Sequence, residues 1–401
     1  MRTSSEFRTA QANPSAGQGK RVLLNAPLHG AGGRETHLLN LCQVLRDQGA
    51  EVTVVSRLAN PETPLLRRRG EMGVRFVGTP FPDEQRWFLF SSAWATALWP
   101  LLLRAESFDV LYSMEVTRFV RFLSRFVKQE GWVIAGRAGD LLRPHERPEE
   151  KVLQCLDAYV VETALQSRAV RQVCGEKMLV ASIPLLGHLG AIAPRGRISH
   201  DELQVRYLGR YDRAKGVFRL LDIWQQLELG CAHLSFHGHG PEEQQLRKEV
   251  ANRGLQGFVS VHGGYSTADE LASIMAETDL LVLLSETEGL PVVLLEAMAY
   301  GVPFVATDVG AVRSLAEENP DVRVVPGTEQ AIVGAIREME AGIRSGAVSG
   351  TRLQRYHSER YGRELVAGKW IQALLSPETF WSEAGESEGL PQQLAPVAAV
   401  R

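Results

Sequence analysis

The chain of 401 residues has few features of membrane-inserted, secreted or metal-binding proteins. Its longest uncharged run, from Trp87 to Leu103, is interrupted by Pro100 and is shorter than the roughly 20 residues that a membrane span needs. The polar first residues lack the apolar core of a signal peptide. The four cysteines are scattered, without CxxC spacing or histidines at metal-ligand intervals. We therefore expect free thiols in a reducing cytoplasm, and no metal site.

Net charge is also small, at −3, which argues against a general nucleic-acid-binding protein. The small total conceals an asymmetry between the two halves. Residues 1–185 contain 24 Lys and Arg against 19 Asp and Glu, whereas the rest of the chain contains 20 against 28. A basic first half and an acidic second half predict different partners for each.

Strand-like and helix-like segments alternate along most of the chain. RVLLNAP (21–27) is typical of a buried strand, the next segment has helical periodicity, and EVTVVSR continues as a strand, which predicts a parallel β-α-β unit. A second such series begins near Val205, with Thr267 as a helix N-cap. The length exceeds that of one ordinary core. The predicted architecture is α/β with two doubly wound Rossmann-like domains: a first domain at 20–190, a second at 191–375, and disordered ends at 1–19 and 376–401.

SETEGLPVVLLEAMAYGVP (285–303) combines two glutamates with a Gly-Leu-Pro break. The preceding strand DLLVLLS is apolar enough to be central, so the loop after it lies at the carboxyl edge, where open α/β sheets bind ligands. A helix starting with Pro291 would direct free amides toward a phosphate there. Glu288 and Glu296 could each accept paired sugar hydroxyls. From spacing alone, the alternative of a dipole-complementing Glu288 and a solvated Glu296 is equally open.

Two further loops carry candidate ligand contacts. LGRYDRAKG (208–216) places cations after a strand, and Arg210 with Lys215 could neutralise a diphosphate, although such loops are more often only solvated. HGAGGRE (29–35) contains glycines that let a backbone approach a ligand closely. A dinucleotide fingerprint would need glycine where Glu35 stands and an acid after the second strand, so a nicotinamide-dependent oxidoreductase is disfavoured.

Taken together, these segments resemble the retaining glycosyltransferases of family 4, which have the GT-B fold. SETEGLPVVLLEAMAYGVPFVATDVGA is similar to the Glu-x7-Glu segment of that family, and YLGRYDRAKG to the opening of its donor domain. GHGPEEQQL and VHGGYSTADELASIMAETDLLVLLS follow the family order, and GAGGRETHLLNLCQVLRDQGAEVTVVS resembles the start of its acceptor domain. The likeness is strong over 205–315, good over 21–57 and faint over 58–200.

The resemblance implies a role for each matching residue in an interdomain cleft. Arg210 and Lys215 would clamp the diphosphate, Glu296 would hold the ribose and Glu288 the donor sugar. Backbone contacts to the phosphate and sugar would come from Gly289, Leu290 and Pro291 on one side and from Gly32 and Gly33 on the other, with base recognition around His262 to Tyr265. No metal or other cofactor is implied, because cations and helix amides stabilise the leaving diphosphate.

One departure from the family concerns the sugar. VIAGRAGDLL places Arg137 where the family usually has a histidine beside the donor sugar. Because of this change, the identity of the transferred sugar stays open. By its position in the family pattern, Arg137 would lie on the acceptor or sugar side of the site. The usual PNG connection between the domains is also replaced, here by IPLLGHLG.

VTRFVRFLSRFVK (116–128) predicts a helix with Arg118, Arg121, Arg125 and Lys128 near one face. Such a helix can lie on an anionic membrane, or it can be an ordinary surface helix, which is the favoured interpretation. The positive balance of the first half nevertheless favours a lipid-linked or anionic acceptor.

The sequence therefore predicts a cytoplasmic, metal-independent retaining glycosyltransferase, with peripheral contact at the inner membrane face as a further prediction. It would move a hexose-type sugar from a UDP- or GDP-linked donor onto a glycan, lipid-linked or small-molecule acceptor. The alternative is a catalytically inactive GT-B protein that binds sugar nucleotides, in which Arg137 marks the lost activity.

Overall fold

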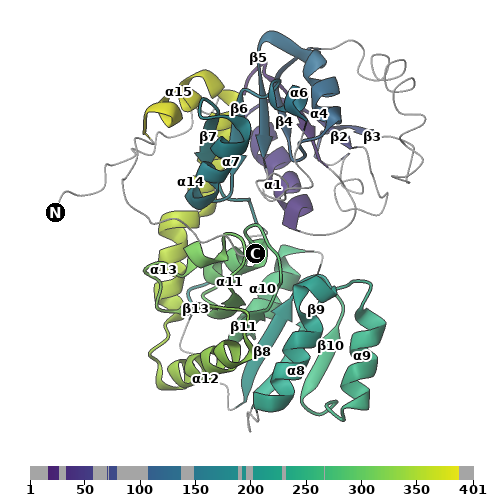
Figure 1. Cartoon of the computed structure of the whole chain (residues 1–401), viewed down its shortest axis with the longest axis vertical. Helices are drawn as coiled ribbons and strands as arrows, with labels where there is room; N and C mark the ends of the chain where they lie inside the picture. Colours follow the sequence, from purple (N-terminus) through teal and green to yellow (C-terminus); the bar gives the residue numbers. More distant parts are fainter. Residues whose placement is uncertain are drawn as a thin grey trace, which may run out of the picture.

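The computed structural model describes residues 17–26, 33–56, 70, 72–78, 107–136, 149–187, 192–195, 202–227, 232–265 and 267–387. These residues form two α/β domains, each built on its own sheet and stacked along the long axis of the molecule (Figure 1). Every strand pairing within both sheets is parallel. The predicted pair of doubly wound domains is confirmed.

The first domain contains a seven-stranded sheet of order β3-β2-β1-β4-β5-β6-β7. Its strands are β1 (Arg21–Asn25), β2 (Glu51–Ser56), β3 (Arg75–Gly78), β4 (Phe108–Ser113), β5 (Val127–Gly136), β6 (Ala158–Val161) and β7 (Leu179–Ser182). Its helices are α1 (Gly33–Asp47), α4 (Arg118–Leu123), the 3₁₀ turn η1 (Ser124–Phe126), α6 (Glu150–Leu153) and α7 (Ala164–Cys174). β1 lies between β2 and β4, and its leucines are buried as expected for a central strand.

The second domain contains a six-stranded sheet of order β10-β9-β8-β11-β12-β13. Its strands are β8 (Leu203–Leu208), β9 (Ala232–His237), β10 (Val259–His262), β11 (Leu280–Leu283), β12 (Phe304–Thr307) and β13 (Val322–Val325). Its helices are η3 (Arg213–Lys215), α8 (Val217–Leu227), α9 (Glu243–Asn252), α10 (Ala268–Ala276), α11 (Val292–Ala299), η4 (Val312–Leu315), α12 (Glu329–Ser345) and α13 (Gly350–Tyr361). Thr267 caps α10, as predicted, by accepting a hydrogen bond from the Glu270 amide at 3.2 Å.

The C-terminal helices return to the first domain. After α13, helices α14 (Arg363–Leu375) and α15 (Pro377–Ser387) run up the side of the first domain (Figure 1). Trp370 and Trp381 are fully buried in the core cluster that also contains residues of β1, β4 and α1. The predicted second-domain boundary at 375 is therefore wrong, and so is the predicted disorder of residues 376–387, because α14 and α15 complete the hydrophobic core of the first domain. The rest of the predicted tail, 388–401, lies outside the described residues.

A second correction concerns residues 116–128. The helix α4 ends at Leu123, and the sequence then enters η1 and strand β5, so Lys128 belongs to the sheet. Phe119, Val120 and Leu123 point into the core, while Val127 already pairs with Phe108 of β4. Residues such as valine and phenylalanine suit a pleated strand as well as a helix, which is why the periodicity alone misled.

Within the described part of the chain, no helix combines the length and apolar composition needed to cross a membrane. The apolar run from Trp87 to Leu103 lies outside the described residues.

Candidate functional site

The loop after β11 brings two of the predicted site residues together. Lys215 donates a hydrogen bond from Nζ to Oε1 of Glu288 at 2.6 Å, and the Ser285 hydroxyl donates to the same oxygen at 2.7 Å. The Glu288 side chain is 10% exposed and that of Lys215 is 33% exposed. The two charges therefore form a largely buried ion pair at the carboxyl edge of the second sheet.

Gly216 is the residue that lets the Lys215 loop approach this edge. Its φ of +74° is in the left-handed region, and a Cβ there would lie 2.2 Å from the Leu284 carbonyl oxygen. Next to it, the Glu286 amide donates to the Ala214 carbonyl at 2.8 Å. The cation loop and the acidic loop are thus joined through their backbones, and any side chain at 216 would separate them.

A third segment, which the sequence reasoning did not identify, supports the acidic loop from the other side. The Ala311 amide donates to the Gly289 carbonyl at 2.9 Å, and the Thr307 hydroxyl to the Ser285 carbonyl at 2.6 Å. Gly310, with φ +58°, would place a Cβ 2.1 Å from the Glu288 carbonyl oxygen. The Asp-Val-Gly-Ala sequence after β12 was the available signal.

Helix α11 begins one residue later than predicted. Pro291 is its N-cap, with φ −65° and ψ 118°, and Val292 is the first helical residue. Leu290 is buried with 3% of its surface exposed, and so anchors the loop in the core. The first turn of α11 still leaves backbone amides without partners inside the helix, at the end where its dipole favours an anion.

Glu296 is not a solvated helix residue. It is 2% exposed and lies where α11 meets the connecting segment, which is the stretch 183–187 after β7. A Cβ on Gly187 would lie 3.3 Å from Oε1 of Glu296. Burial, and then the charge and hydrogen bonding of Glu296, raise the pKa of the half-buried Tyr265 well above its ordinary value. The phenol therefore stays protonated and can donate to this carboxylate.

Arg210 lies in the same loop as Lys215, and its backbone is fixed because the Tyr207 hydroxyl donates to the Arg210 carbonyl at 2.7 Å. Its side chain is 65% exposed, and the Asp212 carboxylate is 3.9 Å from its Nε. The guanidinium is thus oriented weakly in this structure.

The first domain faces this region through the start of α1. A Cβ on Gly33 would lie 3.0 Å from Cγ2 of Val292, the first residue of α11. This contact places Gly33, at the start of α1, against the first residue of α11. The approach of Gly33 to a diphosphate, which the family resemblance implies, stays a prediction. Gly32 and Arg137 lie outside the described residues.

Hydrogen bonds tie the connecting segment to the first domain. The Leu186 amide donates to Nδ1 of His37 at 3.0 Å, and Asn40 donates to the Gly187 carbonyl at 2.8 Å. Burial lowers the pKa of His37 to about 3, so the ring is neutral and can accept this bond. Trp370 of α14 donates from Nε1 to the Pro184 carbonyl at 2.9 Å.

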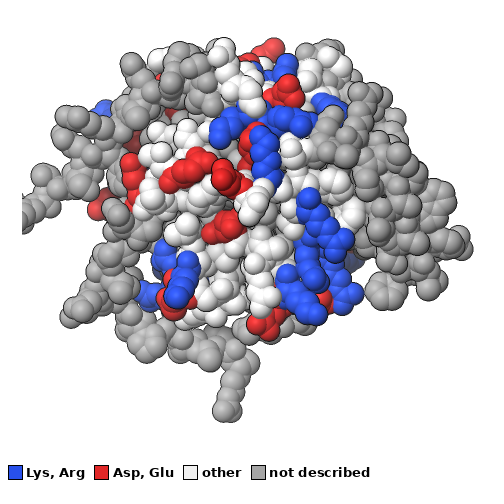
Figure 2. All heavy atoms as spheres, turned by 90° about the horizontal axis from the view of Figure 1, so that it is seen from above, with Lys and Arg blue, Asp and Glu red and all other residues white. Residues whose placement is uncertain are grey.

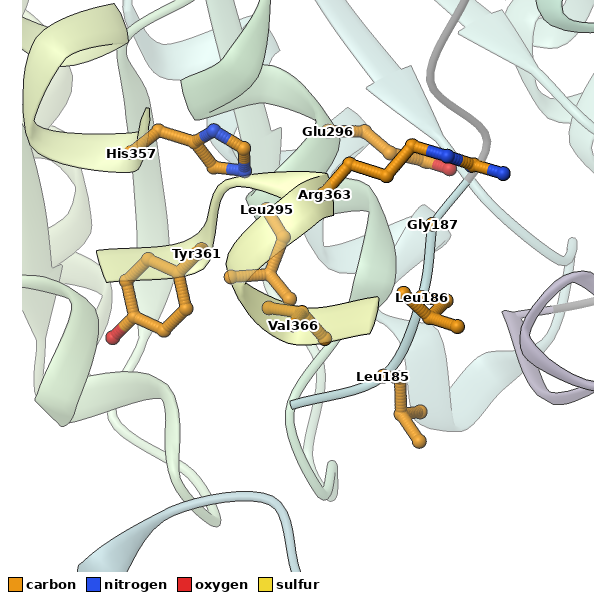
Figure 3. Close-up of a pocket in the computed structure, with 9 residues that line it drawn as sticks. All are labelled: Leu185, Leu186, Gly187, Leu295, Glu296, His357, Tyr361, Arg363 and Val366. Carbon is orange, nitrogen blue, oxygen red and sulfur yellow. The ribbon is translucent and has the colours of Figure 1, made fainter. Parts of the chain in front are cut away.

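A small pocket lies beside this connection. It is lined by residues of the connecting segment, α11, α13 and α14: Leu185, Leu186, Gly187, Leu295, Glu296, His357, Tyr361, Arg363 and Val366. Figure 3 shows the connecting segment along one side, with His357 and Tyr361 on the opposite side. Neither Lys215 nor Glu288 lines this pocket, whereas Glu296 does.

The predicted basic face is divided by acidic partners. Arg118 is ion-paired with Glu149, and Lys128 with Asp109 at 2.6 Å between Nζ and Oδ1. Seen from the end of the first domain, Lys and Arg side chains form separate patches with Asp and Glu side chains between them (Figure 2). The described surface on this side is therefore mixed in charge.

Residues 191–343 match the sequence model of the family described as glycosyl transferases group 1. The amylovoran biosynthesis glycosyltransferase AmsK of Erwinia amylovora is 28% identical over 152 residues, which are 36% of this chain and 37% of AmsK. The alpha-D-kanosaminyltransferase of Streptomyces kanamyceticus is 33% identical over 128 residues, 31% of this chain and 33% of that protein. The matched region thus spans little more than a third of these curated relatives.

Solved structures extend the similarity to both domains. Anabaena HepE, solved in complex with UDP and glucose, superposes with a TM-score of 0.68 over 88% of this chain and 99% of that one, at 18% identity. The lipopolysaccharide outer core galactosyltransferase WaaB superposes with a TM-score of 0.67 over 90% of this chain and 99% of that one, at 16% identity. The fold of this chain is GT-B.

Proposed function

We propose that this chain is a glycosyltransferase that moves a sugar from a nucleoside diphosphate donor onto an acceptor, with retention of the anomeric configuration and without a metal. The observation that carries the proposal is the Lys215–Glu288 pair at the start of α11, inside the segment that matches the group 1 glycosyl transferases. The GT-B relatives whose structures hold UDP and glucose support a sugar nucleotide as the donor.

In this proposal Lys215 acts on the diphosphate and on Glu288 together. An ammonium group has three N–H donors, and in the structure one of them is taken by Glu288. The remaining two can bind phosphate oxygens without breaking the ion pair. Arg210, exposed on the same loop, would turn onto the diphosphate and supply a bidentate contact. The two cations and the amides of α11 would stabilise the leaving diphosphate electrostatically.

Glu288 and Glu296 are assigned different hydroxyl groups of the donor. Glu288, held by Lys215 and Ser285, would accept hydroxyls of the transferred sugar, with Gly289 and Leu290 supplying backbone contacts. Glu296 would hold the ribose, whose hydroxyls would replace the Tyr265 phenol at the buried carboxylate. No side chain is assigned as a nucleophile.

The acceptor is assigned to the first domain and remains a glycan, a lipid-linked or a small-molecule class. Peripheral contact with an anionic membrane is part of the proposal only through the exposed Arg121 and Arg125 of α4 and η1. Because Arg118 and Lys128 are paired with acids, we expect this contact to be weak and to disappear at high salt.

The proposal is tested by ligand binding followed by turnover. The melting temperature is measured with UDP, GDP, ADP, TDP and NAD, since a ligand that binds the native state raises its stability. Titration calorimetry then gives the Kd of each ligand. The matching nucleotide sugars are then incubated with and without EDTA, and release of the nucleoside diphosphate is followed. Proton NMR of the first-formed sugar product reports its anomeric configuration.

The outcomes separate the competing functions. Binding of one nucleoside diphosphate with turnover of its sugar, retention and no effect of EDTA supports the proposal. Binding without turnover, with every acceptor class tried, supports the inactive sugar-nucleotide-binding protein. A response to NAD alone would exclude both.

A further inference from the structure

Glu162 of the first domain reaches across the domain boundary to the acidic loop of the second. It follows β6 directly, and its carboxylate lies over Gly289, the residue after Glu288. A Cβ built on Gly289 would be 2.4 Å from Oε2 and 2.9 Å from Oε1 of Glu162. Glycine at 289 is thus what makes room for an acid from the other domain.

The position of this carboxylate is set by Gln166 of α7. Gln166 donates from Nε2 to Oε2 of Glu162 at 3.2 Å, and its Oε1 accepts from the amides of Glu162 and Thr163 at 3.0 and 3.1 Å. Gln166 is itself buried, with 6% of its surface exposed. The side chain of Glu162 is therefore directed toward Gly289 by a buried neighbour rather than by chance packing.

Glu162 adds a second carboxylate to the edge of the acidic loop. Glu162 is brought beside the loop that already carries Glu288, whose charge is offset by Lys215. The N-cap of α7 does not require it, because Thr163 and Gln166 form that capping box. A carboxylate has two oxygens with several lone pairs, so Glu162 can accept hydroxyl groups in addition to the hydrogen bond from Gln166.

Resting on the proposed function, we propose that Glu162 is a specificity-determining residue that binds hydroxyls of the donor's sugar from the first domain. Glu288 and Glu162 would hold the sugar from opposite sides, one carboxylate from each domain. The sugar, rather than the acceptor, is the occupant because the Glu162 oxygens lie at the residue that follows Glu288. Sugar binding and domain closure would then be coupled, since the site is complete only when the domains meet.

The test separates recognition of the sugar from recognition of the nucleotide. Calorimetry gives the Kd of UDP, UDP-glucose, UDP-galactose, UDP-N-acetylglucosamine, GDP and GDP-mannose for the full chain, and the ratio of nucleotide to nucleotide-sugar Kd measures the contribution of the sugar. Glu162→Gln keeps the shape of the side chain but replaces one of its two acceptor oxygens with an NH2 group. We expect this variant to reduce the ratio of the two Kd values about tenfold, the typical effect of one hydrogen bond to a charged group. Its effect on UDP or GDP alone is expected to stay within twofold.

Two further variants make the result specific. Gly289→Ala leaves the backbone amide in place but forces the Glu162 carboxylate aside, so the same selective loss is expected. Glu150→Gln removes an exposed carboxylate of the same domain and is expected to change neither Kd. Melting curves without ligand verify that each variant is folded.

Each other outcome overturns the inference. If Glu162→Gln weakens nucleotide and nucleotide sugar equally, Glu162 is a closing contact between the domains and not a sugar ligand. If the wild type binds a nucleotide but gains nothing from any attached sugar, or if Glu162→Gln changes nothing, the assignment is wrong while the nucleotide site stands. If the wild type binds no nucleotide, the proposed function fails with it.

Discussion

Lys215→Ala is the most informative single change, because it perturbs stability and ligand binding by separable amounts. Two unit charges about 4 Å apart interact by about 4 kcal/mol in a partly buried setting and by about 1 kcal/mol in water. Glu288 is nearly buried, but a third of Lys215 is exposed, so the Coulomb gain is screened and partly offset by desolvation. We expect Lys215→Ala to cost about 2 kcal/mol of unfolding free energy, which is about 4–8 °C in the melting temperature of a domain of this size.

The assay is urea and thermal unfolding of the wild type, Lys215→Ala, Glu288→Gln and the double variant. Neutralising Glu288 removes the uncompensated charge, so the double variant should lose clearly less than the sum of the single losses. Lys248→Ala, an exposed lysine on α9, is the matched control and should cost under about 0.5 kcal/mol. Nucleoside diphosphate binding should fall at least tenfold in Lys215→Ala and stay close to normal in Glu288→Gln.

The reasoning would be refuted if Lys215→Ala and Lys248→Ala had the same stability, or if the single losses were additive. Unchanged nucleotide affinity in Lys215→Ala would leave the ion pair as a structural contact only.

Three further outcomes follow from the geometry. Gly216→Ala should destabilise the second domain by about 2 kcal/mol or more and abolish nucleotide binding, whereas Gly334→Ala, exposed in α12 with open space around it, should stabilise by about 0.5–1 kcal/mol, both measured by urea unfolding. His37 has a folded pKa of about 3, below its unfolded value near 6.5, so the unfolded state takes up the proton first and stability falls as pH drops below 6.5. The loss attributable to His37 is about 1.4 kcal/mol per pH unit, and a stability profile of His37→Gln that kept the full slope would contradict it. Truncation after Leu375 removes buried Trp381 and should lower the melting temperature of the first domain, a result that an unchanged calorimetric scan would disprove.

Strand and helix order could be predicted because each central strand is an apolar run followed by a loop and an amphipathic segment. The α/β alternation around Val205 and the apolar run before Ser285 both match the observed strands. The segment 116–128 could not be resolved in the same way, since its alternating phenylalanines and arginines fit a helix up to Leu123 and a strand from Val127. Local pattern was overridden there by pairing with β4.

Individual site residues could be predicted from the loop in which each lies. Contacts between segments that are distant in the sequence could not. Lys215 and Glu288 were selected as phosphate and sugar contacts, but the ion pair between them depends on the backbone approach that Gly216 allows. Whether Glu296 was buried or solvated was undecidable from spacing, because burial depends on the connecting segment packing over it. Glu162 lies more than a hundred residues from Gly289, and no local pattern connects them.

The return of α14 and α15 to the first domain has a consequence for biosynthesis. The first-domain core includes Trp370 of α14 and Trp381 of α15. This core cannot be completed until both helices have left the ribosome. The second domain carries all its strands and α8 to α13 in one continuous stretch, and can therefore fold while the chain is still being made. A second domain folded at that stage would hold the two distant pieces of the first domain on one scaffold. We therefore expect the first domain, whose synthesis starts earlier, to finish folding later.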